Sequence, residues 1–525
     1  MTHLPSIFND VIGPVMRGPS SSHTAASWRI ARLAVELLND RLEKALVEFD
    51  RAGAWAPNYR EQGTTIGMDG GLLGLEITDD RMKSTASLAR KRCIHIEYRI
   101  SSFPTSHPNT VRLTLRGISG KQMQIFAVST GGGAFGIRSV DGFPVSLRGD
   151  RHVVLCRSHG NPGALNASIQ SIPADVDHTS EQQGEVTLHV FSACTLFPGA
   201  FLKQLQNETD IEYLSVIKPI MPVIPCNPTV MPFNDLPSLI RCLDNEKEDP
   251  GLGQLGRSYE QILANLSEAA LEQKMQELIR IIHKSIDTGL GGTNYTDRIL
   301  QQQSHLAGRA EDAGRIQPSF MNRIISYVTA LMESKSAMEV VVAVPTAGSC
   351  GTVGGVLRAV AEDIKADQAA ITDAWFAAGL LGVFFAQGPG FSAEEHGCQV
   401  ECGAASGMAA AGLVQLMGGT AREALDAASM AIQNMIGLVC DPVADRVEVP
   451  CLGKNISAAV NAYSSAIMAL SGFNAVIPLE QVIQTIGKVS ATMPCSLKCT
   501  GLGGLAATET SRKIKEQLKN NKEAG

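Results

Sequence analysis

The spacing of hydrophobic residues changes along this chain and divides it into parts. Residues 25–42 carry apolar side chains at helical spacing, whereas residues 94–100 and 110–115 alternate apolar and polar side chains as half-buried strands do. Residues 124–129 form a further strand candidate, which runs directly into a glycine-rich turn. The pattern therefore predicts an α/β domain over residues 1–149, suited to binding a substrate or an effector.

A second unit, residues 150–222, combines strand-like runs with a helix. It includes a turn at residues 160–165 that leads into a short helix, and the order of its elements resembles an ACT-type α+β regulatory module. Such modules usually bind small amino acids. A plain α/β linker domain fits the same pattern, so both interpretations stay open. The strand-like runs are residues 152–156, 185–191 and 211–217, and the helix is residues 197–206.

The rest of the chain begins with a proline-rich stretch and continues with almost unbroken helical spacing. Five prolines between Pro222 and Pro237 predict a linker, which we place at residues 223–257. Residues 258–525 are rich in Ala, Gly and Met, and such small side chains let helices pack closely around a buried cofactor. The expected fold is multidomain, with an α/β N-terminal domain, a small ACT-like α+β domain and an all-helical C-terminal domain.

Size and charge narrow the class of protein. The chain has 525 residues and a net charge of −7, without the basic stripe that nucleic-acid binding requires. The longest apolar run, residues 374–386, is too short to cross a bilayer and predicts a buried helix. The first 18 residues lack the charged and apolar regions of a signal peptide. We therefore expect a cytoplasmic protein that binds neither nucleic acid nor membrane.

The cysteines carry the main chemical signal. Disulfides are rare in the cytosol, so thiols there are free or bind metal. Cys398, Cys440 and Cys451 stand in turn-like sequence between predicted helices, separated by 42 and 11 residues. Soft thiolates suit iron–sulfur clusters, and three thiolates on a four-iron cluster leave one iron open. The spacing lacks the Cys-x-x-Cys pairs of a structural zinc site, but buried free thiols are an open alternative.

Polar segments next to predicted helices and turns are candidates for binding a small ligand. Residues 20–24 read Ser-Ser-Ser-His-Thr just before a helix, where hydroxyls and free backbone amides either bind a carboxylate or cap the helix. The glycines at residues 131–133 and at residue 348 permit turns that bring backbone donors close to a ligand. Plain turns are the competing interpretation of these glycine-rich segments.

Short motifs along the chain occur in the order in which one enzyme family has them. On these motifs the chain resembles the iron–sulfur-dependent L-serine dehydratases, in their single-chain form. The resemblance covers the N-terminal domain and nearly all of the C-terminal half. The motifs are Gly18-Pro19-Ser20-Ser21-Ser22-His23-Thr24, Gly289-Leu290-Gly291-Gly292, Pro345-Thr346-Ala347-Gly348, Gly397-Cys398-Gln399, Cys440-Asp441-Pro442-Val443, Val449-Pro450-Cys451 and Gly501-Leu502-Gly503-Gly504-Leu505-Ala506.

The resemblance implies a homodimeric enzyme whose helical domain is catalytic and holds a [4Fe–4S] cluster on Cys398, Cys440 and Cys451. The open iron would act as a Lewis acid on the β-hydroxyl of L-serine while a base removes the α-proton, and the products would be pyruvate and ammonia. Residues of the matched segments would bind the amino acid. This substrate-binding set is Ser20, Ser21, Ser22, His23, Thr24, Thr130, Gly131, Gly132, Thr346, Gly348, Ser349, Lys454 and Asn455.

The chain departs from the family where the catalytic base is expected. Family members carry a His in a Thr-Gly-Lys-Gly-His stretch after the first helix, but residues 56–75 of this chain contain no His. His23, His396 and Glu61 are the candidates that remain. Histidine suits the role because its pKa lies near neutrality.

Further departures near the predicted pocket leave the substrate open. Gly453-Lys454 stands where the family has Glu-Arg before Asn455, so Lys454 either binds a carboxylate or lies in solvent. One alternative is L-cysteine desulfidation, and another is pyridoxal-phosphate chemistry, which requires a Schiff-base lysine. A third is an amino-acid sensor without catalysis. The role of the extra thiols also stays open, as cluster ligands, pocket lining or core, at Cys350, Cys402, Cys495 and Cys499.

Overall fold

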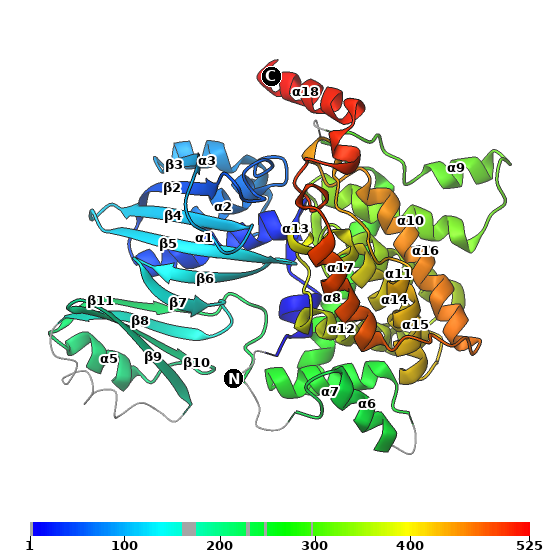
Figure 1. Cartoon of the computed structure of the whole chain (residues 1–525), viewed down its shortest axis with the longest axis horizontal. Helices are drawn as coiled ribbons and strands as arrows, with labels where there is room; N and C mark the ends of the chain where they lie inside the picture. The colour runs from blue at the N-terminus through cyan, green and yellow to red at the C-terminus, as the bar shows by residue number, and fades with distance from the viewer. Residues whose placement is uncertain (1–3, 160–174, 227–230, 246–248, 296–297, 525) are drawn as a thin grey trace.

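The computed structural model divides into a half built on two β-sheets and a half built of helices (Figure 1). It describes residues 4–159, 175–226, 231–245, 249–295 and 298–524. The sheets and the helices that cover them lie side by side with the helical half, and α18 extends from its top. The mixed multidomain architecture that the sequence predicts is therefore present.

The first sheet has six strands in the order β3-β2-β4-β5-β6-β7. β2 and β3 are parallel, and the other neighbours are antiparallel. Alternate residues of β4 (Val111, Leu113 and Leu115) face a core shared with the covering helix α1 (Ala26–Leu38). The strands are β2 (Leu42–Asp50), β3 (His95–Ser101), β4 (Thr110–Gly117), β5 (Gln122–Gly131), β6 (Ala134–Val140) and β7 (Phe143–Leu147); the other helices here are α2 (Thr64–Leu72) and α3 (Thr85–Lys91).

The second sheet has four antiparallel strands in the order β11-β8-β10-β9. Helix α5 (Gly199–Asn207) packs on one face through Phe201 and Leu205. The other face shares the core of the first sheet through Leu155 and Leu188. The turn and short helix predicted at residues 160–165 lie outside the described residues. The strands are β8 (His152–His159), β9 (Val176–Gln183), β10 (Val186–Ala193) and β11 (Ile211–Ile217).

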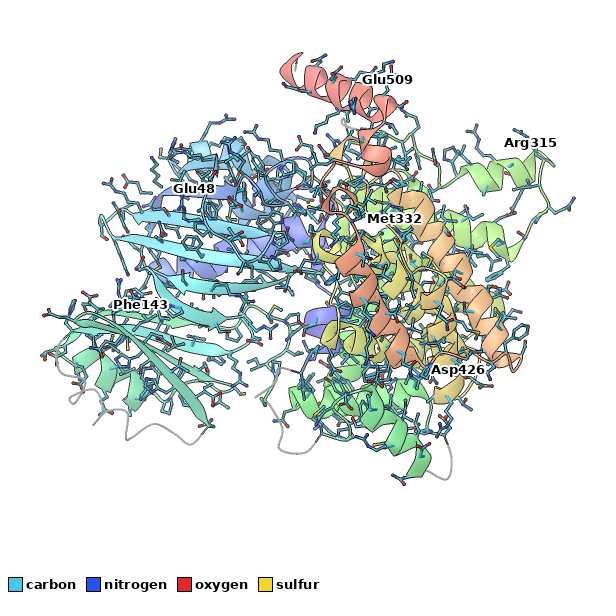
Figure 2. All side chains as sticks on the ribbon, in the orientation of Figure 1. Glu48, Phe143, Arg315, Met332, Asp426 and Glu509 are labelled. Atoms are coloured by element: carbon cyan, nitrogen blue, oxygen red, sulfur yellow. The ribbon has the colours of Figure 1, made fainter. Side chains whose placement is uncertain are left out.

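The helical half is assembled around α14, which packs against α11, α12, α15 and α16. Close packing depends on glycines: a Cβ on Gly407 would lie 2.6 Å from Ile432 Cδ1, and one on Gly412 would lie 2.9 Å from the Ala374 carbonyl. Side chains fill this core, with Met332 inside it (Figure 2). The helices are α6 (Leu236–Asn245), α7 (Leu252–Ala264), α8 (Glu268–Gly291), α9 (Leu306–Asp312), α10 (Phe320–Ser336), α11 (Cys350–Ile364), α12 (Gln368–Gln387), α13 (Ala393–His396), α14 (Cys402–Leu416), α15 (Ala421–Gln433), α16 (Cys451–Leu470), α17 (Leu479–Thr492) and α18 (Glu509–Ala524).

Helix α12 is long and apolar enough to cross a membrane by length and composition alone. However, 72% of its most apolar window is buried inside the protein. Core helices of this kind are apolar on all sides because neighbouring helices surround them. This position matches the buried helix predicted from the apolar run at residues 374–386.

The start of the chain packs on the helical half. Strand β1 (Val15–Arg17) pairs antiparallel with β12 (Val340–Val342), so the half expected to be all-helical contains one short strand. Upstream of β1, a π-helical turn (Ile7–Val11) lies against α12, where a Cβ on Gly382 would come within 2.1 Å of Val11. Because α1 begins at Ala26, the chain crosses from one half to the other within residues 18–25.

The region predicted as a linker, residues 223–257, is partly helical. It contains α6 and the beginning of α7. Leu236, Leu239 and Leu243 recur on one face of α6 and are buried in the helical core. The prolines that suggested a linker precede α6 or stand in its first turn, where proline is compatible with a helix.

Glu260 on α7 is a buried carboxyl group that holds the N-terminal turn in place. Its two oxygens accept hydrogen bonds from Ser6 Oγ (2.5 Å) and from the Ile7 backbone amide (2.7 Å). Burial raises the pKa of Glu260 from 4.5 to about 7. The folded protein therefore keeps a proton that the unfolded chain releases between these two pH values.

We predict that stability falls as the pH rises from 4.5 to about 7, since over this range folding must retain the Glu260 proton. When Glu260 is ionised in both the folded and the unfolded chain, its burial lowers the free energy of unfolding by about 3 kcal/mol. Melting temperatures measured across this range check it: Glu260→Gln should flatten the dependence, whereas Glu480→Gln, on the surface of α17, should leave it unchanged. An equally steep pH dependence in Glu260→Gln would contradict this assignment.

Candidate active site

The Ser-Ser-Ser-His-Thr segment forms a π-helical turn (Ser21–Ala25) that runs directly into α1. It lies where the two halves meet, because the Ala347 amide of the helical half donates to Ser21 Oγ (3.0 Å). Thr24 Oγ1 donates to the Gln62 carbonyl (3.3 Å), which fixes the turn against the segment before α2. Ser21 and Thr24 thus hold the turn in place. The other polar side chains of the turn, Ser22 and His23, belong to a network of polar contacts.

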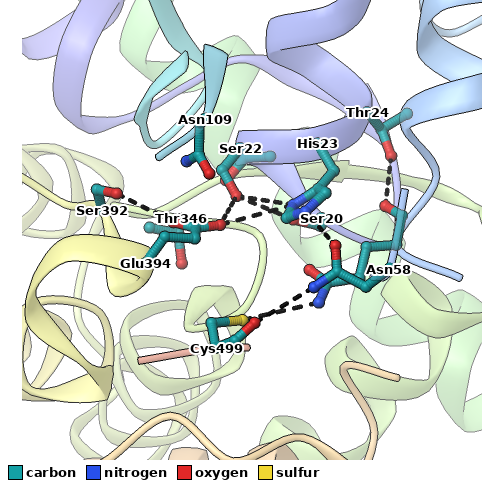
Figure 3. A network of polar contacts seen from close by, with 12 residues as sticks. Ser20, Ser22, His23, Thr24, Asn58, Asn109, Thr346, Ser392, Glu394 and Cys499 are labelled. Carbon is teal, nitrogen blue, oxygen red and sulfur yellow. Dashed lines mark hydrogen bonds and ion pairs between the residues drawn. The ribbon is translucent and has the colours of Figure 1, made fainter. Parts of the chain in front are cut away.

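His23 is fully buried at the centre of a polar network (Figure 3). Its Nε2 lies 3.1 Å from Asn58 Oδ1, and Asn58 Nδ2 donates to the Cys499 carbonyl (3.2 Å). Since that second bond orients the Asn58 amide, His23 Nε2 must carry the proton and donate it to Oδ1. His23 Nδ1 therefore carries no proton and is the hydrogen-bond acceptor of the ring.

The unprotonated nitrogen of His23, Nδ1, faces hydroxyl and carboxylate groups. Ser20 Oγ and Ser22 Oγ each lie 3.1 Å from Nδ1, and Glu394 Oε1 lies 3.7 Å away. Ser22 also donates to Glu394 Oε1 (2.9 Å), and Ser392 donates to Glu394 Oε2 (3.0 Å). Burial lowers the pKa of His23 below 6.5, although Glu394 acts in the opposite direction. The imidazole is therefore neutral near pH 7 and can accept a proton.

The glycine-rich turn at the end of β5 approaches two loops of the helical half. Gly131 has a φ of +93° and pairs with Phe391, where a Cβ would lie 2.5 Å from the Phe391 carbonyl carbon. Gly132 has a φ of +62°, and a Cβ there would lie 3.0 Å from the Pro345 carbonyl. Only glycine tolerates such an approach readily. The turn brings Thr130 and its neighbours to the border of the network.

The segment before α11 contacts a buried acidic side chain, that of Glu401. Thr346 Oγ1 donates to Glu401 Oε1 (2.8 Å) and lies 3.1 Å from Ser349 Oγ. A Cβ on Gly348 would lie 3.0 Å from the same Glu401 oxygen, so this position needs a small residue. Burial, with Cys398 nearby, raises the pKa of Glu401 to about 8.

The three predicted cluster cysteines are buried in or beside adjoining loops, and Cys451 is the first residue of α16. Cys398 is 4% exposed, Cys440 6% and Cys451 9%. The Gln399 amide donates to the Leu438 carbonyl (3.0 Å), which ties the first loop to the second. The second and third loops are joined by a bond from the Val443 amide to the Val449 carbonyl (2.7 Å).

Lys454 interacts electrostatically with all three of these cysteines. Burial alone would lower its pKa, but Cys398, Asp441, Cys440 and Cys451 together raise it. Its Nζ donates to the Val439 carbonyl and to Asp441 Oδ1, each at 2.7 Å. The ammonium group is thus bound by the protein and is largely shielded from solvent.

Asn455 supports the same loops from α16. Its Nδ2 donates to the Gly348 carbonyl (2.8 Å) and to the Cys451 carbonyl (2.9 Å). Its Oδ1 accepts from the Thr352 amide (3.1 Å) and hydroxyl (3.0 Å). All its polar groups are used, so Asn455 links the third cysteine to the segment before α11 and has no capacity left for substrate.

Two of the extra cysteines belong to this site. A hydrogen bond from Cys402 lowers the pKa of Cys398 to about 7, against the effect of burial. The Cys499 amide donates to the Cys440 carbonyl (2.9 Å), and its thiol raises the pKa of Cys440. Burial raises the pKa of Cys350 to about 12 in the core of the helical half, while Cys495 is exposed.

The thiols fit an iron–sulfur cluster better than a single ion. In the described part of the chain, no three His, Cys, Asp or Glu side chains are placed to hold one metal ion. A cluster needs a wider arrangement, because each thiolate binds a different iron. Buried thiol ligands match soft iron–sulfur centres rather than hard cations.

Two of the three candidate bases lie apart from the His23 network. His396 is at the end of α13, with its Nδ1 buried and without a hydrogen-bond partner among the described residues. Glu61 lines a cavity of about 370 Å³ together with Arg60, Lys83 and Arg446. No contact joins either side chain to His23 in the described residues. His23 is therefore the candidate that the structure brings together with the predicted binding residues.

Sequence reasoning missed several residues of this network. Asn58 lies within residues 56–75, where the family His was sought, and its position in that segment was its only sequence signal. Glu394 stands two residues before His396, and Glu401 three residues after Cys398, so proximity to the motifs was the available signal.

Comparison with known proteins identifies the family. The family model described as serine dehydratase alpha chain matches residues 171–506, and the chain belongs to this family. It is 37% identical over 247 residues to a probable L-serine dehydratase alpha chain of Bacillus subtilis, covering 47% of this chain and 82% of that protein. It is 34% identical over 257 residues to an L-serine dehydratase alpha chain of Peptoniphilus asaccharolyticus, covering 49% and 88%.

A separate beta chain also matches. The probable L-serine dehydratase beta chain of Bacillus subtilis is 38% identical over 150 residues, which cover 29% of this chain and 66% of that protein. One chain here is thus similar to two kinds of chain that are named separately there. This agrees with the resemblance to the single-chain form of the family.

We predict that Asn455→Ala destabilises the protein by about 3 kcal/mol, because it leaves buried carbonyl and amide groups of two loops unpaired. Thermal unfolding followed by circular dichroism measures the effect. The control is Asn245→Ala at the exposed end of α6, whose side-chain amide donates to the Arg241 carbonyl (2.9 Å), with an expected change within about 0.5 kcal/mol. Similar losses in both variants would contradict the described role of Asn455.

Proposed function

We propose that this chain is an L-serine dehydratase, which converts L-serine to pyruvate and ammonia with a [4Fe–4S] cluster on Cys398, Cys440 and Cys451. The observation that carries the proposal is the meeting of buried thiols with the neutral His23 at one junction. Asn58 connects them, since it bonds both His23 and the Cys499 carbonyl beside Cys440. The relatives are named for L-serine, which supports a hydroxyl leaving group rather than a thiol.

A cluster held by the three cysteines supplies a Lewis acid for the β-hydroxyl of the substrate. Neighbouring groups favour the thiolate of Cys398, whereas the pKa values of Cys440 and Cys451 are raised, so iron would have to displace the protons of those two thiols. Lys454 places a positive charge among the sulfur atoms, and Cys402 donates to Cys398. Buried thiolates need such compensation, because desolvation disfavours their charge.

His23 is the proposed base for the α-proton. Its Nδ1 has the lone pair, and burial keeps the ring neutral. After accepting the proton, the imidazolium would be stabilised by Glu394, 3.7 Å away. Loss of the hydroxyl as water gives the enamine of the amino acid, which takes up water and releases ammonia to form pyruvate.

The substrate carboxylate is proposed to bind at the π-helical turn (Ser21–Ala25). Ser20 presents a hydroxyl there, and the turn precedes α1, whose N-terminal end favours negative charge. Thr130 and the glycines after it offer further backbone donors at the same border. Lys454 is assigned to the thiols instead, because Asp441 already neutralises it.

We further infer that the four-stranded unit is an ACT-like module that binds a small amino acid. Along the chain, β8, β9 and β10 are followed by α5 and then by β11, and in the sheet the strands lie in the order β11-β8-β10-β9. This arrangement is that of a split β-α-β fold. We place the enzyme in the cytoplasm, where thiols stay reduced. We propose a homodimer, for which Phe473 (57% exposed) and Val476 (77%) offer apolar surface after α16.

Anaerobic purification tests the proposed cofactor. We predict about four iron and four sulfide per chain, with formation of pyruvate and ammonia from L-serine. Cys398→Ser, Cys440→Ser and Cys451→Ser should each lose most of the iron, because serine is a poor ligand for soft iron. Cys156→Ser is the matched control: Cys156 is equally buried but lies in the core under the four-stranded sheet, and the variant should keep the iron. Full iron content in the three site variants would refute the assignment.

We predict that the acid limb of kcat/KM for L-serine lies below pH 6.5, because burial lowers the pKa of His23 and protonation removes the base. His23→Gln should reduce kcat at least ~100-fold. His396→Gln and Glu61→Gln serve as controls and should keep most activity and the same pH profile. An acid limb that moves in His396→Gln or Glu61→Gln, but not in His23→Gln, would assign the base elsewhere.

A further inference from the structure

Asn109 is a buried polar residue at the start of the strand next to the site, and its side chain is unsatisfied. It is fully buried, yet neither Oδ1 nor Nδ2 has a hydrogen-bond partner in the described residues. Its backbone is firmly placed: the Ser129 amide donates to its carbonyl (3.1 Å), and its own amide donates to His107 Nδ1 (3.1 Å). The free amide is thus held rigidly and is not a disordered surface group.

The loop that carries Asn109 is fastened to the helix that carries Glu394. Since His107 Nδ1 accepts from the Asn109 amide, its Nε2 is the donor, and it lies 3.3 Å from Glu395 Oε2. Glu394 is the preceding residue on α13. Figure 3 shows the Asn109 side chain pointing toward the network. An unpartnered amide therefore faces the place where the substrate is proposed to bind.

The charges of the network indicate which part of an amino acid fits there. Glu394 is buried, and its partners in the site are the hydroxyls of Ser22 and Ser392 and the neutral His23. A buried carboxylate attracts a cation, and an amide oxygen accepts hydrogen bonds from one. The carboxylate of the substrate is repelled from this side and is left to the π-helical turn.

We propose that Asn109 Oδ1 and the Glu394 carboxylate form the subsite for the α-ammonium group of the substrate. This inference rests on the proposed function and identifies how the site recognises an amino acid rather than a hydroxy acid. Binding gives Asn109 Oδ1 a hydrogen-bond donor, which it lacks among the described residues. The α-carbon is then held between this subsite and the carboxylate site, close to His23 Nδ1.

The test compares L-alanine with L-lactate as ligands of the parent protein and of Asn109→Leu. Neither has a β-hydroxyl to eliminate, and they differ in having an ammonium or a hydroxyl group on the α-carbon. The parent should bind L-alanine more tightly, as measured by calorimetry. Asn109→Leu, of similar size, should weaken L-alanine at least tenfold, raise KM for L-serine by a similar factor, and leave L-lactate within about twofold. If Asn109→Leu does not fold, Asn109→Ala takes its place.

Stability separates binding from a structural role. Because the Asn109 side chain has no hydrogen-bond partner among the described residues, Asn109→Leu should keep or raise the melting temperature. The control is Asn461→Leu on α16, which breaks the bonds of the Asn461 side chain to Ser406 Oγ and to the Ala431 carbonyl (each 2.8 Å) and should melt lower with unchanged L-alanine affinity. Unchanged L-alanine affinity in Asn109→Leu, or no L-alanine binding by the parent, overturns the subsite. If the parent binds L-alanine but does not deaminate L-serine, the proposed reaction fails and the subsite is still decided by the variant.

Discussion

The site depends on the attachment of the N-terminal segment to the helical half. Pairing of β1 with β12, together with the packing of Val11 on α12, fixes the chain just before it crosses to α1. The crossing segment carries Ser20, Ser22 and His23, so the position of the proposed base is set by an anchor on the opposite half. Without this anchor the polar turn and the thiols would belong to two bodies with no fixed relation.

Burial then determines the chemistry of the groups assembled there. It keeps His23 neutral and raises the pKa of Glu401 to about 8, so two groups with different ordinary charges are both uncharged near neutrality. Lys454 has the opposite response, because its neighbours outweigh desolvation. The junction therefore places a cation next to the sulfur atoms and a neutral acceptor next to the hydroxyls.

The sequence predicted those parts of the proposed site that form short motifs of consecutive residues. The Ser-Ser-Ser-His-Thr turn and the cysteines of the three loops were found because each stands in a short motif. Asn58, Glu394 and Asn109 were not found, because a single polar residue has no pattern and acquires its role through contacts between distant segments. For the fold, alternation in β4 was enough to predict a strand, whereas the prolines near α6 concealed a helix whose leucines are buried.

The path of the chain has a consequence for dividing it. A break between the four-stranded sheet and α6 would separate the sheets from most of the helices, but it would also remove β1 from its pairing with β12. The helical fragment would then expose a strand edge and the groove on α12 that Ile7 and Val11 fill. Such a fragment would tend to recruit another extended segment to that edge, so this protein is better regarded as one interlocked body than as domains on a string.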